Sequence, residues 1–482
     1  MFLSMIKALT RLNTNHYRIV AHSTRKLSTI TLFGPEGYVR ARIELTSTEP
    51  DVTKMVLVEN RPYFPLLSID PTDESSMVQS TRSIVDAYYS SADVCSADYQ
   101  AKVTQIAGGL TNALFRIDFT TKSVLVRIFG AEGMIDRDEE SATFARLCGP
   151  PYSSNTDGSV DIKVVHPDLD MIGRFANGRV EMWIPNMKQS VLSDFDTNLM
   201  GDVARCLARL HHGFEVPSYF YKAECREINE KTERVRVLRP RLWEMIYSWI
   251  DELESTLSRE KFGDPDLLRL FHEAVLGETG TCKDSIIWYL RRETDWLKSI
   301  VHQQHPNSAV AFTHNDLCTA NILLDQSQES DPCIIDYEYG SINYTMYDIA
   351  NFFCELCGGN DNAVPNFESF PSIERQRMFL SEYYQESRKV LRQKNRDNQR
   401  VCNEDEEITK LLSQIKLFQM ASNLIWGVWG ILQACCEADN DEYCKKDAKL
   451  RLDGQIDTNS FNNLRYGKNR LINYKLCKER FS

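Results

Sequence analysis

The sequence predicts an α+β protein built as two lobes, in which a small antiparallel β lobe precedes a larger, mainly helical lobe. Two observations support this prediction. Strand-like segments gather between residues 102 and 129 and again at 179–184, where Pro185 ends the run. The remainder of the chain is mostly helical in pattern. We therefore place the N-terminal lobe at 55–185 and the C-terminal lobe at 186–482.

Residues 1–54 differ from both lobes and are expected to form a leader. The first 35 residues contain no Asp or Glu, but they carry Lys7, Arg11, Arg18, Arg25 and Lys26 among Ser and Thr. This composition fits an organellar transit peptide. It fits equally a disordered extension, or a start codon placed upstream of the true start at Met55. These interpretations stay open.

The N-terminal lobe begins with three expected strands and a helix. The strands cover 102–106, 113–119 and 123–129, and a glycine turn at 107–109 follows the first. A helix is expected at 138–147, because its acidic first turn suits the positive end of the helix dipole and apolar residues follow.

The C-terminal lobe shows helical patterns separated by polar segments. In 198–211 an apolar stripe recurs every three to four residues. The apolar run 424–436 is shorter than the ~20 residues of a membrane span, which predicts a buried core helix and no transmembrane segment. The polar segments 393–407 and 439–457 lack periodicity and are expected to be solvated loops.

Bulk composition excludes two classes of protein. The net charge of −12 argues against a nucleic-acid binder, because such proteins usually carry a basic excess on the binding surface. The 14 cysteines are scattered, and the C-x-x-C pair Cys354 and Cys357 lacks the two further ligands that a zinc site needs. Idle thiols suit a reducing compartment. A cytoplasmic location is therefore expected, with organellar import through the basic N-terminus as the alternative.

Chemistry-bearing residues concentrate in 309–355. A buried strand at 309–313 delivers the loop His314-Asn315-Asp316, and Asn321 opens a second strand that returns through a polar turn to Asp336. In such a hairpin the start of one strand lies beside the end of its partner, so Asn321 and Asp336 are expected to be neighbours. Two oxygen ligands beside a third carboxylate make a natural Mg²⁺ site.

Asp316 is the expected catalytic residue. Phosphoryl transfer needs a metal to offset phosphate charge and a carboxylate that holds the acceptor hydroxyl in line. Asp316 precedes Asn321 by the spacing found in the protein-kinase pattern H-R-D-x-x-x-x-N. A chance His-x-Asp in a loop is the alternative, which the later Asn, the hairpin and the Asp336/Glu338 pair make much weaker.

The N-terminal lobe has candidate nucleotide-binding groups. A Gly-Gly turn between strands can cover ATP phosphates with its N–H groups, although a plain β-turn is the alternative. Arg127 is the candidate cation, held by Glu140, unless it is a strand residue whose head group extends to water. Backbone groups at 182–184 are expected to bind adenine. The candidates are Gly109, Thr111, Asn112, Arg127, Glu140, Met182 and Ile184.

These segments resemble the choline/ethanolamine kinase family, which shares the fold of protein kinases and aminoglycoside phosphotransferases. The resemblance rests on GGLTNALFR (108–116), VLVRIFG (124–130), FANGRVEMWIP (175–185), LARLH (207–211), THNDLCTANILL, IIDYEYGSINYTMYDIANFFCE and SNLIWGVWGILQA (422–434). The segment that runs from IDYEY through YDIAN to Glu355 is highly specific to the family. The resemblance implies a protein-kinase-like two-lobe fold, ATP as co-substrate and Mg²⁺ as cofactor.

The family pattern implies a role for each matching residue. Asp316 would be the base, Asn321 and Asp336 the Mg²⁺ ligands, and Glu338 a support for the metal or substrate end. The implied amine pocket consists of Tyr339, Glu355, Trp426, Trp429, Phe461 and Tyr466, beside Asp316. Trp426 and Trp429 stand three positions apart on an expected helix and face the same way. Aromatic faces attract a cationic head group by ~0.5–2 kcal/mol each. Without the resemblance, core packing would be the better interpretation of this pair.

The substrate is expected to be ethanolamine. The phrases YFPLLSIDP, VRIFGAEGMIDRDEE and Asn315-Asp316-Leu317 look more like ethanolamine kinases. After Glu355 the chain reads Leu-Cys-Gly-Gly, where choline kinases tend to place further aromatics. Cys318 departs from both groups, because choline kinases usually carry Gln there and ethanolamine kinases do not usually carry Cys.

We therefore expect an ethanolamine kinase that makes phosphoethanolamine for phosphatidylethanolamine synthesis. The alternatives are a choline or dual-specificity kinase, an aminoglycoside-type phosphotransferase, and a catalytically silent pseudokinase that binds nucleotide. The oligomeric state is left open, with a homodimer as one option.

Overall fold

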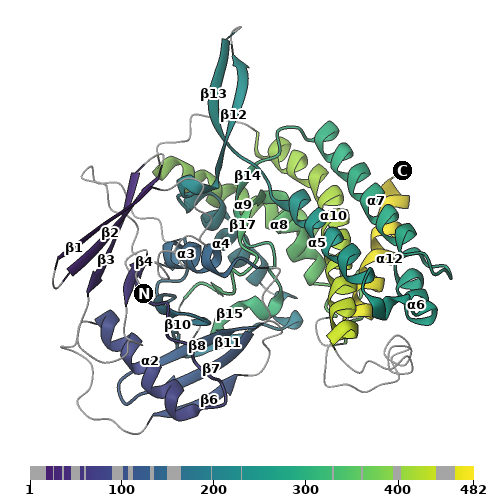
Figure 1. The fold of residues 1–482 in the computed structure, drawn as a ribbon. Coiled ribbons are helices and arrows are strands. Elements are labelled where there is room, and N and C mark those ends of the chain that lie inside the picture. Colours follow the sequence, from purple (N-terminus) through teal and green to yellow (C-terminus); the bar gives the residue numbers. More distant parts are fainter. Residues whose placement is uncertain are drawn as a thin grey trace. The chain divides into compact units, whose positions relative to one another are not determined.

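The computed structural model describes residues 18–24, 27–34, 37–44, 55–58, 61–89, 101–106, 112–130, 135–148, 164–196, 198–228, 231–327, 330–359, 362–394, 403–440 and 462–481. Contacts divide the chain into two compact units, 1–156 with 165–185 and 157–164 with 186–482. Strands dominate the first unit and helices the second (Figure 1). The predicted α+β class is confirmed.

The first unit is built on a seven-stranded sheet. Its strands follow the order β4 (Val56–Val58), β5 (Arg61–Phe64), β9 (Met171–Phe175), β10 (Gly178–Met182), β8 (Ser123–Phe129), β7 (Asn112–Asp118) and β6 (Lys102–Ile106). All neighbours pair antiparallel except β5 and β9, which are parallel. The helix α2 (Glu74–Tyr89) packs against β5 and β9, and α3 (Arg137–Cys148) packs against β9.

Alternation of side chains along β8 explains where this unit has its core. Val124, Val126 and Ile128 are buried together with Ile117 of β7 and Ile84 of α2. Successive strand residues point to opposite faces of a sheet, so every second residue of β8 reaches this core. The expected strands between 102 and 129, and the helix expected at 138–147, lie within one residue of their expected ends.

Part of the expected leader forms a second, separate sheet. The strands β1 (Arg18–Thr24), β2 (Leu27–Gly34) and β3 (Gly37–Glu44) pair antiparallel in sequence order. Sequence analysis did not predict these strands. The β-branched content of β2, which reads LSTITLFG, favours a strand. The role of residues 1–54 as a leader stays a prediction.

The second unit is mainly helical. Its helices are α4 (Leu199–Gly213), α5 (Leu242–Leu257), α6 (Pro265–Leu276), α7 (Lys283–Gln304), α8 (Thr345–Glu355), α9 (Ile373–Gln393), α10 (Glu404–Asn440) and α12 (Asn463–Phe481). Short sheets accompany them: β14 (Val310–Thr313) with β17 (Ser341–Tyr344), β11 (Met187–Gln189) with β15 (Ile322–Asp325) and β16 (Cys333–Ile334), and the hairpin of β12 (Tyr221–Ile228) and β13 (Lys231–Leu238).

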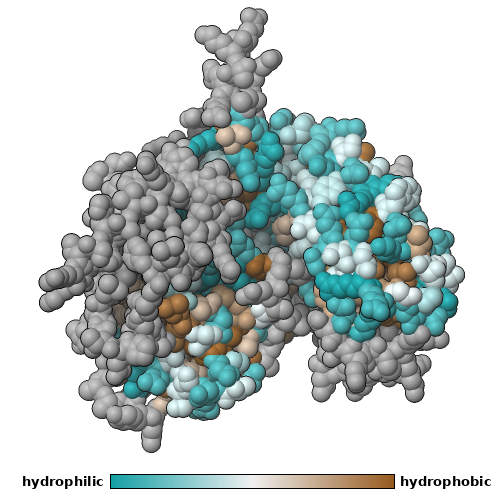
Figure 2. All heavy atoms as spheres, in the orientation of Figure 1, coloured by the Kyte–Doolittle hydropathy of each residue, from teal (hydrophilic) through white to brown (hydrophobic). Residues whose placement is uncertain are grey.

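The long helix α10 is the centre of this unit, because α5, α7, α8, α9 and α12 all pack against it. Its segment 424–436 is buried almost throughout, as predicted for a core helix. Within the described part of the chain, no helix combines the length and the apolar character needed to cross a membrane. The face of this unit seen in Figure 2 is mainly hydrophilic, with scattered hydrophobic residues.

Parts of the two segments predicted to be solvated loops, 393–407 and 439–457, belong to helices. Gln393 is the last residue of α9, and residues 404–407 form the acidic first turn of α10. The helix dipole stabilises acidic side chains in that position. Asp439 likewise belongs to α10, which continues to Asn440. The remaining parts, 395–402 and 441–457, lie outside the described residues.

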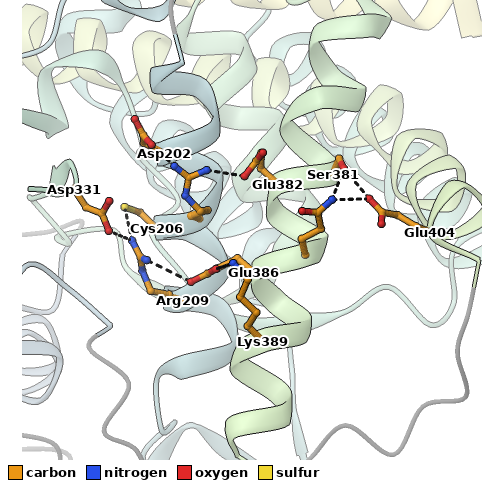
Figure 3. Close-up of polar contacts among 11 residues, drawn as sticks. Asp202, Cys206, Arg209, Asp331, Ser381, Glu382, Glu386, Lys389 and Glu404 are labelled. Carbon is orange, nitrogen blue, oxygen red and sulfur yellow. Dashed lines mark hydrogen bonds and ion pairs between the residues drawn. The ribbon is translucent and has the colours of Figure 1, made fainter.

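A polar network joins α4, α9 and the start of α10 (Figure 3). Glu404 accepts hydrogen bonds from Ser381 Oγ at 2.7 Å and from the amide of Gln385 on α9. On the facing side, Arg209 of α4 pairs with Asp331 at 2.6 Å and with Glu386 of α9 at 3.4 Å. Asp331 lies just before β16, so this surface ion pair reaches the chain ahead of that strand.

The helices α10 and α12 approach closely at a glycine seam, formed by Gly427 and Gly430 of α10 and Gly467 of α12. A Cβ placed on Gly430 would lie 2.7 Å from the backbone nitrogen of Gly467 and 2.8 Å from the carbonyl oxygen of Asn463. A Cβ placed on Gly467 would lie 2.8 Å from the nitrogen of Ile431. Only glycine permits this backbone contact.

We predict that Gly430→Ala lowers the free energy of unfolding by about 1–3 kcal/mol, because the added methyl group must push two backbones apart. Chemical unfolding of the purified variant measures the change. Gly201→Ala is the matched control: its Cβ would meet only the ends of two flexible side chains, Glu382 at 3.4 Å and Arg205 at 3.5 Å. The control should be neutral or stabilising by up to ~1 kcal/mol, since alanine is the better helix former. Equal losses in both variants would contradict the seam.

Candidate active site

The loop that carries Asp316 follows β14, and its conformation is unusual. Asn315 has a φ of +69°, in the left-handed region that few side chains adopt. Its amide stabilises this conformation by donating to Tyr339 O at 2.8 Å and to Ser341 Oγ at 2.9 Å. Its oxygen accepts from Thr313 and from Asn343. The loop is thus bonded to the segment that ends in β17.

Asp348, in the first turn of α8, clamps the same loop. Its fully buried carboxylate accepts the backbone N–H of His314 at 2.9 Å and that of Asn315 at 2.7 Å. His211 of α4 lies 3.0 Å from the same carboxylate and 2.9 Å from the hydroxyl of Tyr383. Burial alone would raise the pKa of Asp348, but the hydrogen bond and charge of His211, with the backbone N–H of His314, hold it below its ordinary value. The clamp is therefore an ionised carboxylate.

His314 connects the loop to the second hairpin. Its Nε2 lies 2.8 Å from the carbonyl oxygen of Ile335, and its Nδ1 accepts the backbone N–H of Asp316 at 3.2 Å. These partners require a proton on Nε2 and a lone pair on Nδ1, which is the neutral imidazole. Burial lowers the pKa of His314 and favours that form.

The hairpin of β15 and β16 brings Asn321 and Asp336 to one end. Asn321 immediately precedes β15, and its carbonyl oxygen accepts the N–H of Ile335 at 3.0 Å. Its side-chain Nδ2 donates to the carbonyl oxygen of Asp316 at 2.9 Å. Asp336 follows with a φ of +67°. The candidate base and the two candidate metal ligands therefore belong to one hydrogen-bonded assembly.

Four carboxylates share this region of the second unit. Burial raises the pKa of Asp316 well above its ordinary value, and the charges of Glu355, Glu338 and Asp336 raise it further, whereas Arg470 lowers it. Such a concentration of negative charge fits a divalent cation.

The donor chemistry fits Mg²⁺ in particular. Because Nδ2 of Asn321 is engaged, its oxygen is the atom turned toward a ligand, and Asp336 and Glu338 supply carboxylate oxygens. Among the described residues, no three His, Cys, Asp or Glu side chains form a metal-binding group by themselves. Mg²⁺ needs none, since it is usually held by one or two carboxylates together with substrate phosphates and water.

Aromatic side chains form a cluster in the second unit. The rings of Trp426 and Trp429 on α10 lie 5.6 Å apart, and Tyr339 lies 5.5 Å from Trp426. Trp429 donates its indole N–H to the hydroxyl of Tyr339 at 3.2 Å and lies 6.2 Å from the ring of Tyr466. Four residues of the predicted pocket are therefore together. The fifth aromatic, Phe461, lies outside the described residues.

Sequence analysis missed one member of this cluster. Trp249 of α5 lies 6.1 Å from Tyr339 and 6.2 Å from Trp426. Its helix shows an ordinary buried stripe, with Ile246, Trp249, Ile250 and Leu253 at helical spacing, which predicts only core packing. No local signal in the sequence separates Trp249 from its neighbours.

The last predicted pocket residue, Glu355, ends α8 and is almost fully buried. Its Oε1 accepts a hydrogen bond from Arg470 of α12 at 2.7 Å. Sequence analysis did not single out Arg470. It stands four positions after Tyr466, and that helical spacing was the one signal that could have found it.

The first unit contains the predicted phosphate cation within a buried charge cluster. Arg127 donates to Glu181 at 2.9 Å, and Glu181 also accepts from Arg179 at 2.7 Å. Arg179 in turn pairs with Glu140, which Arg137 also contacts at 2.9 Å. The arginines hold the pKa values of both buried glutamates below their ordinary values, against the effect of burial. These three arginines and two glutamates leave one surplus positive charge.

The other nucleotide candidates are only partly described. Gly109 and Thr111 lie outside the described residues, and Asn112 begins β7. The N–H of Met182 donates to the carbonyl oxygen of Asp170 at 2.8 Å, so this N–H is already engaged. Ile184 is buried just after β10. Binding of ATP by these groups stays a prediction.

Comparison with known proteins gives a consistent result. The family model described as choline/ethanolamine kinase matches residues 103–475. A probable choline kinase of Arabidopsis thaliana is 26% identical over 342 residues, covering 69% of this chain and 78% of that protein. A probable ethanolamine kinase of the same plant is 27% identical over 349 residues, covering 71% of this chain and 75% of that protein.

The ethanolamine kinase structure from Plasmodium vivax superposes with a TM-score of 0.57 at 19% identity, covering 83% of this chain and 89% of that one. The predicted fold is confirmed.

We predict that Asp348→Asn lowers the free energy of unfolding by about 1–3 kcal/mol, because the amide NH₂ leaves a buried donor of the loop without its acceptor. Turnover should fall at least ~10-fold, since Asp316 loses its fixed position. Asp331→Asn is the control, because it weakens an exposed ion pair worth at most about 1 kcal/mol. Unfolding and initial-rate measurements on both variants test this, and equal losses would show that the clamp has no special role.

Proposed function

This chain belongs to the choline/ethanolamine kinase family, and we propose on that premise that it transfers the γ-phosphate of ATP to the hydroxyl of ethanolamine. One observation carries the proposal. The buried Asp316 feels the charges both of Asp336 and Glu338, the candidate metal-binding carboxylates, and of Glu355 from the proposed amine pocket. A carboxylate in that position can serve an alcohol whose amine end is held by Glu355 and the aromatic cluster.

In the proposed reaction, Asp316 accepts the proton of the substrate hydroxyl while the hydroxyl oxygen attacks the γ-phosphorus of ATP. The bond between that phosphorus and the β,γ-bridging oxygen breaks, and ADP leaves with the bonding electron pair. Asn321, Asp336 and Glu338 would hold Mg²⁺, which offsets the charge on the phosphates. The protein's own part is positional: Asp348 and His314 fix the loop, and Asn321 fixes the carbonyl of Asp316.

Ethanolamine is favoured over choline by the chain that follows Glu355. Gly358 and Gly359 have φ values of +70° and +92°, and a Cβ on Gly359 would lie 2.6 Å from the nitrogen of Pro365. A side chain therefore cannot be added there without strain, and no aromatic wall comes from this turn. A primary ammonium can instead donate hydrogen bonds to a carboxylate such as Glu355.

A second candidate, choline, is favoured by a different observation. The cluster of Trp249, Tyr339, Trp426, Trp429 and Tyr466 offers several aromatic faces, which suit a quaternary ammonium that cannot donate hydrogen bonds. The trimethylammonium group would rely on these faces alone. Direct comparison of the two amines therefore decides between the candidates.

We expect ADP release with Mg·ATP to be at least ~10-fold higher in kcat/KM with ethanolamine than with choline. Asp316→Asn should lower kcat by ~10²-fold or more and leave ATP binding largely intact, because only the base is lost. A preference for choline would reverse the proposed substrate. No turnover with either amine, despite ATP binding, would indicate a silent nucleotide-binding protein.

We expect Trp426→Ala to raise KM for the amine at least ~10-fold and to change KM for ATP less than ~2-fold, because the indole contributes a recognition surface. Trp288→Ala is the matched control, since Trp288 of α7 is 61% exposed. It should leave both constants unchanged. Equal shifts in both KM values for Trp426→Ala would mean that this tryptophan only packs the core.

A further inference from the structure

A buried ion pair lies beside the proposed amine pocket. Arg470 Nη2 donates to Glu355 Oε1 at 2.7 Å, and the two side chains are only 1% and 6% exposed. Breaking such a pair on one side is strongly unfavourable, whereas replacing both partners by neutral groups is often tolerated. A buried ion pair is therefore weak support for a purely stabilising role. The position of this pair beside the proposed amine pocket suggests a role in substrate binding instead.

Arg470 contacts three of the helices that carry pocket residues, α8, α10 and α12. Its guanidinium lies 5.4 Å from the ring centre of Tyr466, one turn earlier on α12, and it reaches Glu355 at the end of α8. On α10 it approaches Ser422 Oγ at 3.5 Å. Ser422 donates to Asn351 Oδ1 at 2.8 Å, and the same oxygen accepts the indole N–H of Trp426 at 2.7 Å. Arg470 thus lies between the pocket carboxylate and the hydrogen bonds that orient a pocket aromatic.

The charge of Arg470 and of the acidic groups around it indicates the role of this residue. Burial opposes the charge of Arg470, but Tyr466 and Glu355 raise the pKa of the guanidinium above its ordinary value, so it stays protonated. It offsets part of the negative field that Glu355, Glu338 and Asp336 exert on Asp316. A buried carboxylate without a partner would favour its neutral form. Arg470 therefore supplies a buried counter-charge to Glu355, 2.7 Å from its carboxylate oxygen.

A carboxylate can accept about four hydrogen bonds, so a carboxylate that pairs with an arginine can also accept from an ammonium group. A neutral or reoriented Glu355 would lose most of its attraction for such a group. The loss would be greater for a primary ammonium, which donates hydrogen bonds, than for a quaternary one, which depends on aromatic faces.

We propose that Arg470 is a positioning residue of the amine site, which holds Glu355 charged and oriented to receive the ammonium of the substrate and thereby favours primary over quaternary amines. This inference rests on the proposed function, because it needs an amine substrate that contacts Glu355. It adds a residue outside the predicted pocket to the determinants of specificity.

Four variants test the inference: Arg470→Met, Arg470→Lys, Glu355→Gln and the double variant Arg470→Met/Glu355→Gln. Initial rates give KM for ethanolamine, choline and ATP. We expect Arg470→Met to raise KM for ethanolamine at least ~10-fold, KM for choline less, and KM for ATP less than ~2-fold. Arg470→Lys should recover part of the loss, since it restores the charge without the planar fork. Arg480→Met, at an exposed position of α12, is the control and should change nothing.

The double variant separates positioning from packing. If Arg470 acts through Glu355, its removal has no further effect on KM once Glu355 is neutral, so the double variant should match Glu355→Gln. Independent effects that multiply in the double variant would overturn the proposal, as would equal shifts in KM for amine and ATP. Should Arg470→Met fail to fold, the double variant, which leaves no unpaired buried charge, still gives this comparison against Glu355→Gln.

Measurements on the wild-type protein distinguish failure of this inference from failure of the proposed function. Turnover of either amine by the wild type, with no selective effect of Arg470→Met, would overturn this inference and leave the kinase function standing. A wild type that turns over neither amine would overturn the proposed function and this inference with it.

Thermal melting of the wild type with and without ethanolamine gives an independent readout of binding: the melting temperature should rise with ethanolamine, and the rise should shrink in Arg470→Met. Equal rises in both proteins would overturn the inference.

Discussion

The carboxylate of Asp348 is the interaction on which the candidate active site depends. It accepts the backbone N–H groups of His314 and Asn315 and is itself held by His211, so three segments far apart in sequence meet at one buried charge. A charged acceptor makes stronger hydrogen bonds than a neutral one, especially where water is excluded. The left-handed conformation of Asn315 persists because this clamp and the Asn315 side-chain bonds determine it fully.

The loop that Asp348 holds is also hydrogen-bonded to the segments that carry the candidate metal ligands. His314 bonds the carbonyl of Ile335, next to Asp336, and Asn321 bonds the carbonyl of Asp316. Side chains of one strand pair thus hold backbone groups of the other, so hydrogen bonds link the candidate base to the segments of the candidate metal ligands. Glu355 lies at the end of α8, which carries Asp348 in its first turn. A single helix, α8, therefore links loop geometry to the amine pocket.

Much of this arrangement follows from the sequence, and the limits have physical causes. The hairpin that brings Asn321 to Asp336 is predictable, because strand pairing is local and its register is set by a short turn. Arg470 and Trp249 were missed, because their partners lie on other helices and tertiary pairing leaves no periodic pattern along the chain. The strands at 18–44 were missed for another reason. The positive charge of the N-terminal segment was taken as the main signal, although its β-branched residues favour strands.

The glycine seam between α10 and α12 limits how the amino-acid sequence around this pocket can change during evolution. Three residues without side chains lock the register of the two helices, so neither can slide along the other as surrounding residues change. A single added carbon at the crossing would therefore be purged by selection, and lineages of this protein should hardly vary at all in the seam.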